Sequence, residues 1–241
     1  MLKKFLLTIF INFSLWSYTP GKWSHLDSVI MKKTDAKPKK EVVKSPSDKV
    51  LYSAEFEYDK DGNLIKEKYL NSTGKEDGYT RYSYRGKMVI KEELFGLDGK
   101  IKETRIFEYD KNDNLKRLRL LDSSGIDTVH YKIKEVMNNE LQSIEVLWLG
   151  SKDMEYYNVK RSPDSEFKFI QEISLENRKT MGQVIYMYDK NKKLISRMNS
   201  VSDDRKQNNI KYDQEGRVQS FTFHVKRGGK WELLKTHEIL Y

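Results

Sequence analysis

The stretch YDKDGNL, which begins at Tyr58, carries oxygen-bearing side chains at alternating positions. Asp59, Asp61 and Asn63 have the spacing with which a calcium-binding EF-hand loop begins. Such a loop needs a glycine at its sixth position and a glutamate at its twelfth, but Gly62 is the fourth residue and Leu70 the twelfth. Aspartate, asparagine and glycine are also the residues that tight turns prefer. The stretch is therefore either a weak calcium site or the corner of a hairpin.

Later copies of the stretch favour the hairpin corner. YDKNDNL begins at Tyr109, YDKNKKL at Tyr188 and YDQEGRV at Tyr212. Lys193 and Arg217 replace Asn63 in the last two copies, and neither side chain has an oxygen that can bind calcium. Because every copy keeps small polar residues that suit a turn, we predict hairpin turns and no metal site. Weak calcium binding by the first copies is the remaining alternative.

Catalytic motifs are missing from the sequence. The four histidines, His25, His130, His224 and His237, have no metal-binding spacing, and there is no nucleophile elbow or phosphate-binding loop. The chain has no cysteine, which excludes thiol chemistry and disulfides. We therefore predict a non-enzymatic protein without catalytic residues or cofactors. A carboxylate pair assembled only in space would make the less favoured alternative, an envelope hydrolase.

One irregular stretch, LWLGSKDMEYYNVKRSPD, is the best candidate for binding a ligand. Its aromatic and basic residues interrupt the pattern that the rest of the chain follows. We take Trp148, Tyr156, Tyr157 and Arg161 as candidate ligand-binding residues; a longer loop is the structural alternative.

That pattern is a repeat of about 26 residues. A shorter copy begins at Tyr84, and two degenerate copies are placed at Glu135 and Arg161. The residue six positions after each start is apolar in all seven copies: Leu64, Ile90, Leu115, Leu141, Phe167, Leu194 and Val218. This agreement supports the register, because these positions were not used to define it.

Each repeat has the pattern of two strands and two turns. Aromatic residues two positions apart, as in FEY, lie on one face of a strand, and charged residues such as those of IKEKY lie on the other. We expect an all-β fold: an antiparallel meander of about seven two-strand repeats, with 12–14 strands, forming one long curled or spiralling sheet. A lipid-facing barrel is disfavoured because its outer band would have to lack charge. The recurring tyrosines are predicted to pack the sheet rather than to stack sugars or bases.

Three regions divide the chain. Residues 1–21 resemble a signal peptide, with Lys3 and Lys4 before a 12-residue apolar run that is too short for a membrane span. Residues 22–49 are rich in lysine, proline and serine and are predicted to be a flexible linker. Residues 1–49 hold +6 of the net charge of +9, so weak contact of this linker with an anionic surface is an alternative to a plain spacer. Residues 50–241 form the β-hairpin repeat domain.

The YDxxGNL units resemble the YD repeats of Rhs and teneurin-type secreted proteins, and also the hairpin arrays of MORN-like bacterial proteins. The resemblance covers about residues 50–241 and is weak between 130 and 180. In Rhs proteins long arrays form a shell around a toxin, and this chain is too short for such a shell. The resemblance implies the strand-turn-strand unit and an extracytoplasmic setting.

Together these features predict an exported protein, periplasmic, cell-surface or secreted, that acts by binding or as a structural component. We expect a protein or glycan ligand and no specific nucleic acid. The alternative is an immunity-like repeat protein that binds a partner toxin. No transmembrane span is expected in the mature chain.

Overall fold

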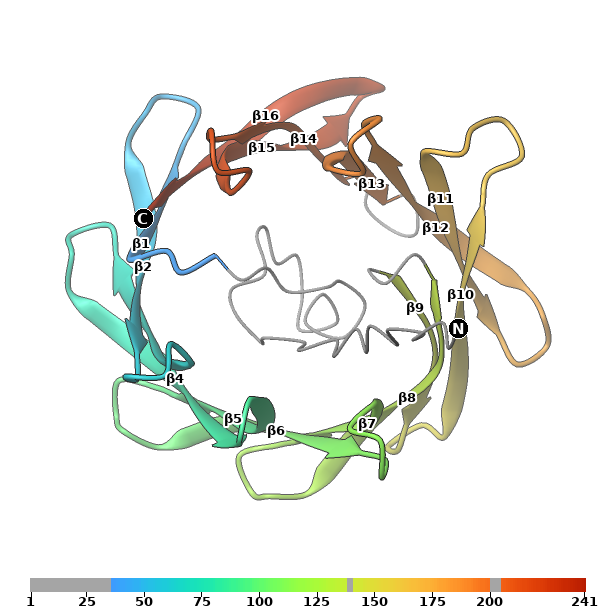
Figure 1. Ribbon diagram of the computed structural model, residues 1–241, viewed down its shortest axis with the longest axis horizontal. Helices are drawn as coiled ribbons and strands as arrows, with labels where there is room; N and C mark the ends of the chain where they lie inside the picture. Colours follow the sequence, from blue (N-terminus) through green and yellow to red (C-terminus); the bar gives the residue numbers. More distant parts are fainter. Residues whose placement is uncertain (1–35, 138–140, 200–204) are drawn as a thin grey trace, which may run out of the picture.

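The computed structural model of the chain describes residues 36–137, 141–199 and 205–241. In these ranges sixteen strands form one closed antiparallel barrel, seen along its axis in Figure 1. The described residues include no helix long and apolar enough to cross a membrane. The predicted signal peptide and residues 22–35 of the predicted linker lie outside the described residues.

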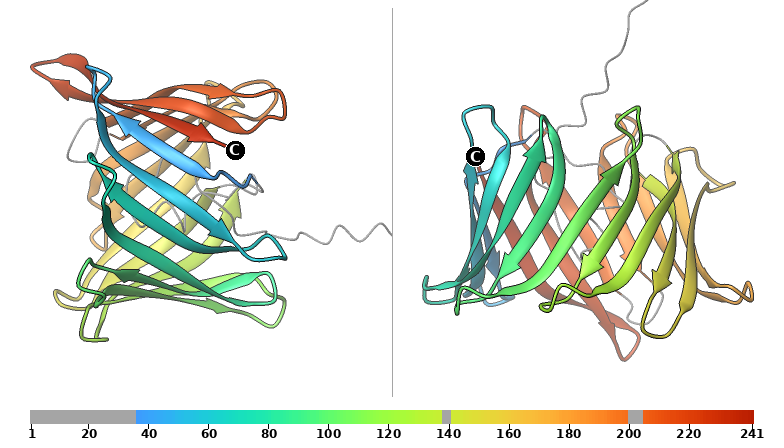
Figure 2. Two further views of the ribbon diagram at one scale, coloured as in Figure 1. Left: turned by 90° about the vertical axis from the view of Figure 1, so that its left-hand side faces the viewer. Right: turned by 90° about the horizontal axis from the view of Figure 1, so that it is seen from below.

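The strands follow one another around the ring in the order of the sequence. They are β1 (Lys40–Lys44), β2 (Val50–Tyr58), β3 (Leu64–Asn71), β4 (Glu76–Arg85), β5 (Met88–Phe95), β6 (Ile101–Tyr109), β7 (Leu115–Leu121), β8 (Asp127–Met137), β9 (Leu141–Trp148), β10 (Asp153–Arg161), β11 (Lys168–Leu175), β12 (Thr180–Tyr188), β13 (Leu194–Asn199), β14 (Arg205–Tyr212), β15 (Val218–Arg227) and β16 (Lys230–Leu240). They are tilted against the barrel axis (Figure 2), as closure of a sheet requires.

Strand β1 closes the ring. It pairs with β2 on one side and with β16 on the other, so that Val43 lies opposite both Tyr52 and His237. The prediction of an open, curled or spiralling sheet is therefore wrong, although the all-β antiparallel meander is right. The closing strand, KEVVK, lies inside the lysine-rich segment 22–49 that its composition predicts to be a linker. Residues 40–44 form a strand despite their polar composition because they pair with two neighbouring strands.

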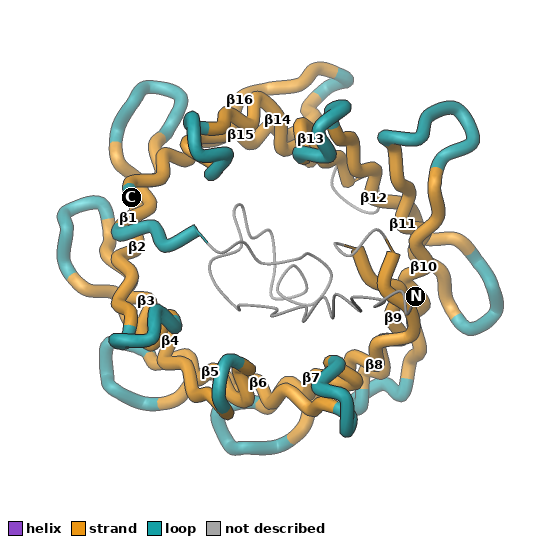
Figure 3. The backbone as a smooth tube through the Cα atoms, in the orientation of Figure 1, coloured by secondary structure: helices purple, strands orange, loops and turns teal. Residues whose placement is uncertain are grey.

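The turns at both ends of the barrel follow the predicted periodicity (Figure 3). The seven predicted starting positions, 58, 84, 109, 135, 161, 188 and 212, each fall within the last three residues of an even-numbered strand, from β2 to β14. The tight turns of the YD stretches therefore lie at one end of the barrel, and the second turns of the repeats lie at the other end.

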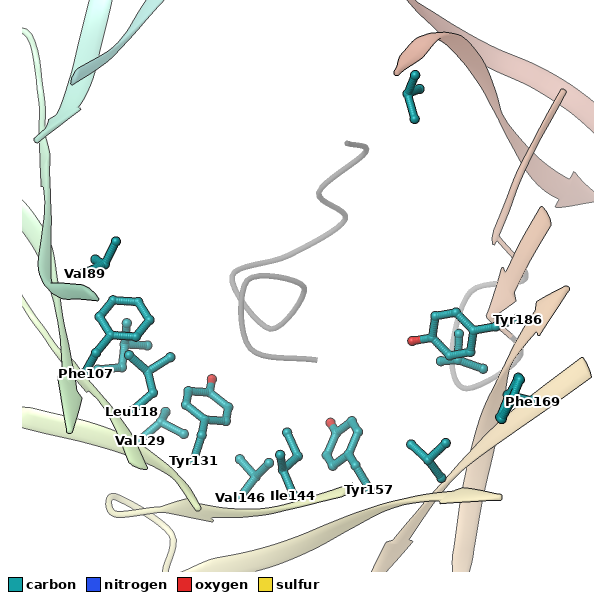
Figure 4. Close-up of a cluster of buried hydrophobic side chains, with 14 of the residues drawn as sticks. Val89, Phe107, Leu118, Val129, Tyr131, Ile144, Val146, Tyr157, Phe169 and Tyr186 are labelled. Atoms are coloured by element: carbon teal, nitrogen blue, oxygen red, sulfur yellow. The ribbon is translucent and has the colours of Figure 1, made fainter. Parts of the chain in front are cut away.

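Apolar and polar side chains alternate along the strands. In β2, Ala54 and Phe56 are buried on the inner face, whereas Glu55 and Glu57 lie on the outer face. Figure 4 shows the buried side chains of β5 to β12 pointing into the interior of the ring. The core of this protein is therefore the inner wall of the barrel.

Candidate functional site

Most of the recurring tyrosines join one hairpin to the previous one. The hydroxyl of Tyr84 donates to the carbonyl oxygen of Leu64 at 2.7 Å, and that of Tyr109 donates to the carbonyl oxygen of Val89 at 2.8 Å. The same bond is made by Tyr58 to Pro38, Tyr212 to Leu194 and the last residue, Tyr241, to Val218. These hydroxyls are engaged within the protein, which supports a packing function for this set of tyrosines.

The aspartate of the YD stretch is likewise occupied by its own turn. One carboxylate oxygen of Asp59 accepts hydrogen bonds from the backbone N–H groups of Asp61 and Asn63, at 2.9 and 2.8 Å. The Asn63 amide donates to the other carboxylate oxygen at 2.8 Å. These bonds, that from the Asn63 backbone first, lower the pKa of Asp59. The described residues contain no cluster of three or more His, Asp or Glu side chains suited to a metal.

The structure does not bring the four predicted ligand-binding residues together. Trp148 and Tyr157 lie on the inner face, where Trp148 packs against the buried cluster and Tyr157 is itself part of it. Tyr156, next in sequence to Tyr157, lies on the outer face opposite Glu145 and Ser174. Arg161, at the end of β10, has its guanidinium 5.6 Å from the centre of the Phe169 ring. Tyr156 and Tyr157 lie on opposite faces of the sheet because successive side chains of a strand point to opposite faces.

A cluster of buried polar side chains lies on the inner face of β3 to β6. The Tyr82 hydroxyl donates to Glu67 at 2.9 Å, and Arg105 donates to Glu92 at 2.9 Å and to Glu103 at 2.8 Å. Burial, with the charges of Glu67 and Glu92, raises the pKa of Tyr82 well above its ordinary value. Burial alone would lower the pKa of Arg105, but the two carboxylates that it binds raise it. This arc of the wall carries an excess of negative charge.

A second polar cluster lies on the inner face of β11 to β14. Arg197 is 1% exposed, and its Nε donates to the Gln207 side-chain oxygen at 3.1 Å. The Tyr186 hydroxyl donates to the buried Gln171 side-chain oxygen at 3.4 Å. A guanidinium and two amides thus mark this arc, in contrast to the carboxylates on β3 to β6. The inner wall is apolar for the most part and presents opposite charges on separate arcs.

The seam between β1 and β16 contains a third inner cluster. Nδ1 of His237 is 2.6 Å from a carboxylate oxygen of Glu41, and its ring stacks on Phe221 with centroids 4.4 Å apart. Burial lowers the pKa of His237, although Glu41 acts in the opposite direction. Nearby, the Lys235 ammonium donates to the Tyr52 hydroxyl at 2.8 Å. The two ends of the barrel domain are therefore joined by side chains as well as by backbone pairing.

None of these inner polar residues was a candidate in the sequence. Glu67 and Glu92 each lie in a strand whose charged residues are mostly on the outer face. Such residues could be found in the sequence as charged residues that share the alternating positions of the apolar residues in their strand. Finding them requires the strand register to be known.

The outer face of β1 to β11 is a surface of ion pairs. Glu55 lies 3.2 Å from Lys40 and 2.8 Å from Lys68, on the two neighbouring strands. Similar pairs recur around the ring: Arg81–Glu93, Arg117–Glu108, Lys134–Glu145 and Lys160–Glu172. This face is polar along the middle of the strands as well as at their ends.

Comparison with known proteins supports the fold alone. No family model and no curated protein matches the chain. Among solved structures, it is similar to a porin-like protein from Bacteroides uniformis, with a TM-score of 0.54 and 10% sequence identity over 85% of this chain and 97% of that one. A porin-like protein from Bacteroides vulgatus gives a TM-score of 0.36 at 12% identity, covering 86% of this chain and 99% of that one. This second similarity is too low to show a common fold. The first similarity shows a porin-like all-β barrel architecture.

Proposed function

We propose that this protein is an exported, non-enzymatic β-barrel that binds an extended polypeptide in its interior. The observation that supports it best is the inner wall. The sixteen strands turn an apolar face inward, and the side chains of that face are buried, Leu118, Tyr131 and Val146 completely so. Tyr131, Tyr157 and Tyr186 point their hydroxyls toward the interior of the ring (Figure 4), and those of Tyr157 and Tyr186 donate to Glu155 and Gln171.

The composition of the wall favours a polypeptide over a glycan. Aliphatic side chains such as Leu118, Ile144 and Val146 form much of the wall, and they suit apolar ligand groups. The wall also contains buried groups of both charges, the carboxylates on β3 to β6 and the guanidinium of Arg197 on β13, each held by partners within the wall. An unfolded polypeptide carries apolar, acidic and basic groups along one chain, whereas a neutral glycan carries no charged group.

The polarity of the outer face favours a barrel that is surrounded by water. A lipid-facing barrel needs an uncharged outer band about 25 Å tall. Ion pairs such as Lys68–Glu55 and Arg81–Glu93 occupy the middle of the outer face here, and placing them in lipid would leave charges without hydration. The polar groups of the inner arcs engage one another, which favours binding over acid–base catalysis.

Binding is tested with purified full-length protein and a permanently unfolded polypeptide, reduced and carboxymethylated lactalbumin, followed by calorimetry. We expect saturable binding that Tyr157→Ser weakens by about tenfold, because the variant removes an inner aromatic contact. Tyr156→Ser is the matched control, since this neighbour lies on the outer face. Equal effects of both variants, or binding of dextran but not of the polypeptide, would contradict the proposal. Thermal unfolding of each variant checks that the barrel is intact.

We propose that the protein is exported because the apolar run after Lys3 and Lys4 has the pattern of a signal peptide. Fusion of residues 1–49 to a phosphatase that is active only outside the cytoplasm is expected to give activity. Replacement of Leu6 and Leu7 by aspartate is expected to abolish it. Activity that is retained in this variant would exclude the apolar run as the export signal.

A further inference from the structure

The hairpin of β15 and β16 projects beyond the other hairpins at its end of the barrel (Figure 2). The last residue of β1, Lys44, pairs with Thr236, so residues 230–235 extend past the end of β1. On its other side β16 pairs with β15 as far as Lys230. Residues 230–235, at the hairpin tip, therefore have no pairing with β1 on that side of the hairpin.

Exposed apolar side chains gather at this tip. Trp231, Leu233 and Leu234 are 38%, 37% and 41% exposed. Val50 and Leu51, at the start of β2, are also exposed and lie across the end of β1. The bond between Lys235 and Tyr52 joins the two strands at this point. Val50, Leu51, Trp231, Leu233 and Leu234 make up five of the thirteen exposed large apolar residues in the described part of the chain.

Basic residues surround the apolar cluster. Lys226, Arg227 and Lys230 flank the glycines of the turn, and Glu232, 3.8 Å from Arg227, is the one acidic residue between positions 226 and 235. The ammonium of Lys206 on β14 lies 6.0 Å from the centre of the Trp231 ring. Tryptophan and leucine within a ring of lysine and arginine form a surface with an apolar centre and a positive border.

We propose that the β15–β16 hairpin docks on the surface of an anionic lipid bilayer. Tryptophan favours the boundary between headgroups and acyl chains, and leucine favours the acyl side. Basic residues gain from the negative surface potential of acidic phospholipids. Such contact is peripheral and is compatible with the ion pairs on the outer face of the barrel. It involves neither the interior proposed to bind polypeptide nor residues 22–49.

A second copy of the chain is a less suitable occupant. If two β16 edges paired antiparallel over residues 230–235, Lys230 of each copy would lie opposite Lys235 of the other. Like charges at directly opposite positions destabilise strand pairing, and lysines on an edge oppose such association. The charge of the tip is complementary to an anionic surface instead.

Sedimentation of the full-length protein with vesicles tests the proposal. We expect binding to phosphatidylcholine vesicles with 30% phosphatidylglycerol, and little binding to phosphatidylcholine alone. Lys226→Gln with Lys230→Gln is expected to weaken binding on the order of tenfold, since each basic residue contributes to attraction. Trp231→Ser with Leu234→Ser should also weaken it, with the remaining binding lost more readily at high salt.

Two matched variants locate the contact. Lys190→Gln with Lys192→Gln removes the same charge from the β12–β13 turn at the other end of the barrel. Leu97→Ser with Ile126→Ser removes two highly exposed apolar residues from other turns. Neither variant should change binding. An equal loss in either control, equal binding to neutral vesicles, or no binding to either vesicle would overturn the proposal. So would dimerisation in ultracentrifugation that Trp231→Ser abolishes, because a second copy would then occupy the tip.

Discussion

Single side chains connect one repeat to the next in this barrel. The tyrosine that begins a YD stretch reaches back about twenty residues to a backbone carbonyl, as Tyr84 does to Leu64. A buried carbonyl without a partner costs free energy, so the hydroxyl contributes more than its packing area alone. The conserved geometry of five such bonds explains why the sequence repeats tyrosine where phenylalanine would pack equally well.

Replacing Tyr84 by phenylalanine tests this contribution. The variant keeps the ring but leaves the Leu64 carbonyl without its bond, and we expect the free energy of unfolding to fall by about 1 kcal/mol. Urea unfolding measures the change. Tyr79→Phe, on the outer face where the ring stacks on Phe95, is the control and should have a smaller effect. Equal losses would show that the carbonyl bond is not what the tyrosine supplies.

The seam histidine makes stability depend on pH. Burial lowers the pKa of His237 below its ordinary value of 6.5. The charge of Lys235 also lowers this pKa, whereas Glu41 raises it. Below pH 6.5 the unfolded chain takes up a proton more readily than the folded barrel, so this stabilisation is present above that pH and is lost as the pH falls through it.

We therefore expect the melting temperature of the parent protein to fall more between pH 7.5 and 5 than that of His237→Phe. A parent and His237→Phe with parallel pH profiles would show that His237 does not titrate differently in the two states.

At the scale of the element, the turns are set by local chemistry. Gly125 has a φ of +78°, and its N–H donates to the carbonyl of Asp122. The Asp122 carboxylate accepts from two backbone N–H groups of the same turn. An aspartate followed three residues later by glycine is thus sufficient for this corner, which is why the turns could be predicted from the sequence.

Gly125→Ala is expected to lower stability by about 1 kcal/mol, because alanine is strained at this φ. Space is not the reason, since an added Cβ would meet nothing within 4 Å. Gly150→Ala is the matched control: its surroundings are equally open, but its φ lies outside the left-handed range. Thermal unfolding of both variants measures the difference, and equal stabilities would remove φ as the cause.

At the scale of the whole molecule, closure depends on β1. This strand has only five residues, yet it covers the edges of both β2 and β16. Edges that remain uncovered invite pairing with other chains. Closure can be tested by making the same substitution at two neighbouring valines of β1. Val43 is buried on the inner face, and Val42 lies on the outer face.

Val43→Asp places a second carboxylate beside Glu41 on the buried inner face of the seam and is expected to open the ring. We expect a marked loss of thermal stability and larger species in size-exclusion chromatography. Val42→Asp should leave both close to the parent, since its side chain lies on the polar face. A monomeric, stable Val43→Asp variant would show that β1 is not needed to close the barrel.

The sequence by itself determined the parts of this fold that depend on neighbours along the chain. Alternation in FEYDKDGNL specified a strand with an apolar face and the turn after it, and the 26-residue period repeated that unit. The tertiary structure decided what depends on distant residues. A meander of this kind stays open or closes according to its register and to whether its ends can pair. Here the ends pair because Val43 meets His237, 194 positions later in the chain.

The candidate site shows the same division. Trp148 and Tyr157 were found as deviations from the repeat, but only strand register places Tyr156 on the other face of the barrel. Glu67 and Arg105 look like solvated charges in sequence, and only closure turns them inward beside Tyr82 and Glu92. A strand presents alternate residues to opposite faces, and which face becomes the interior is decided when the whole ring closes.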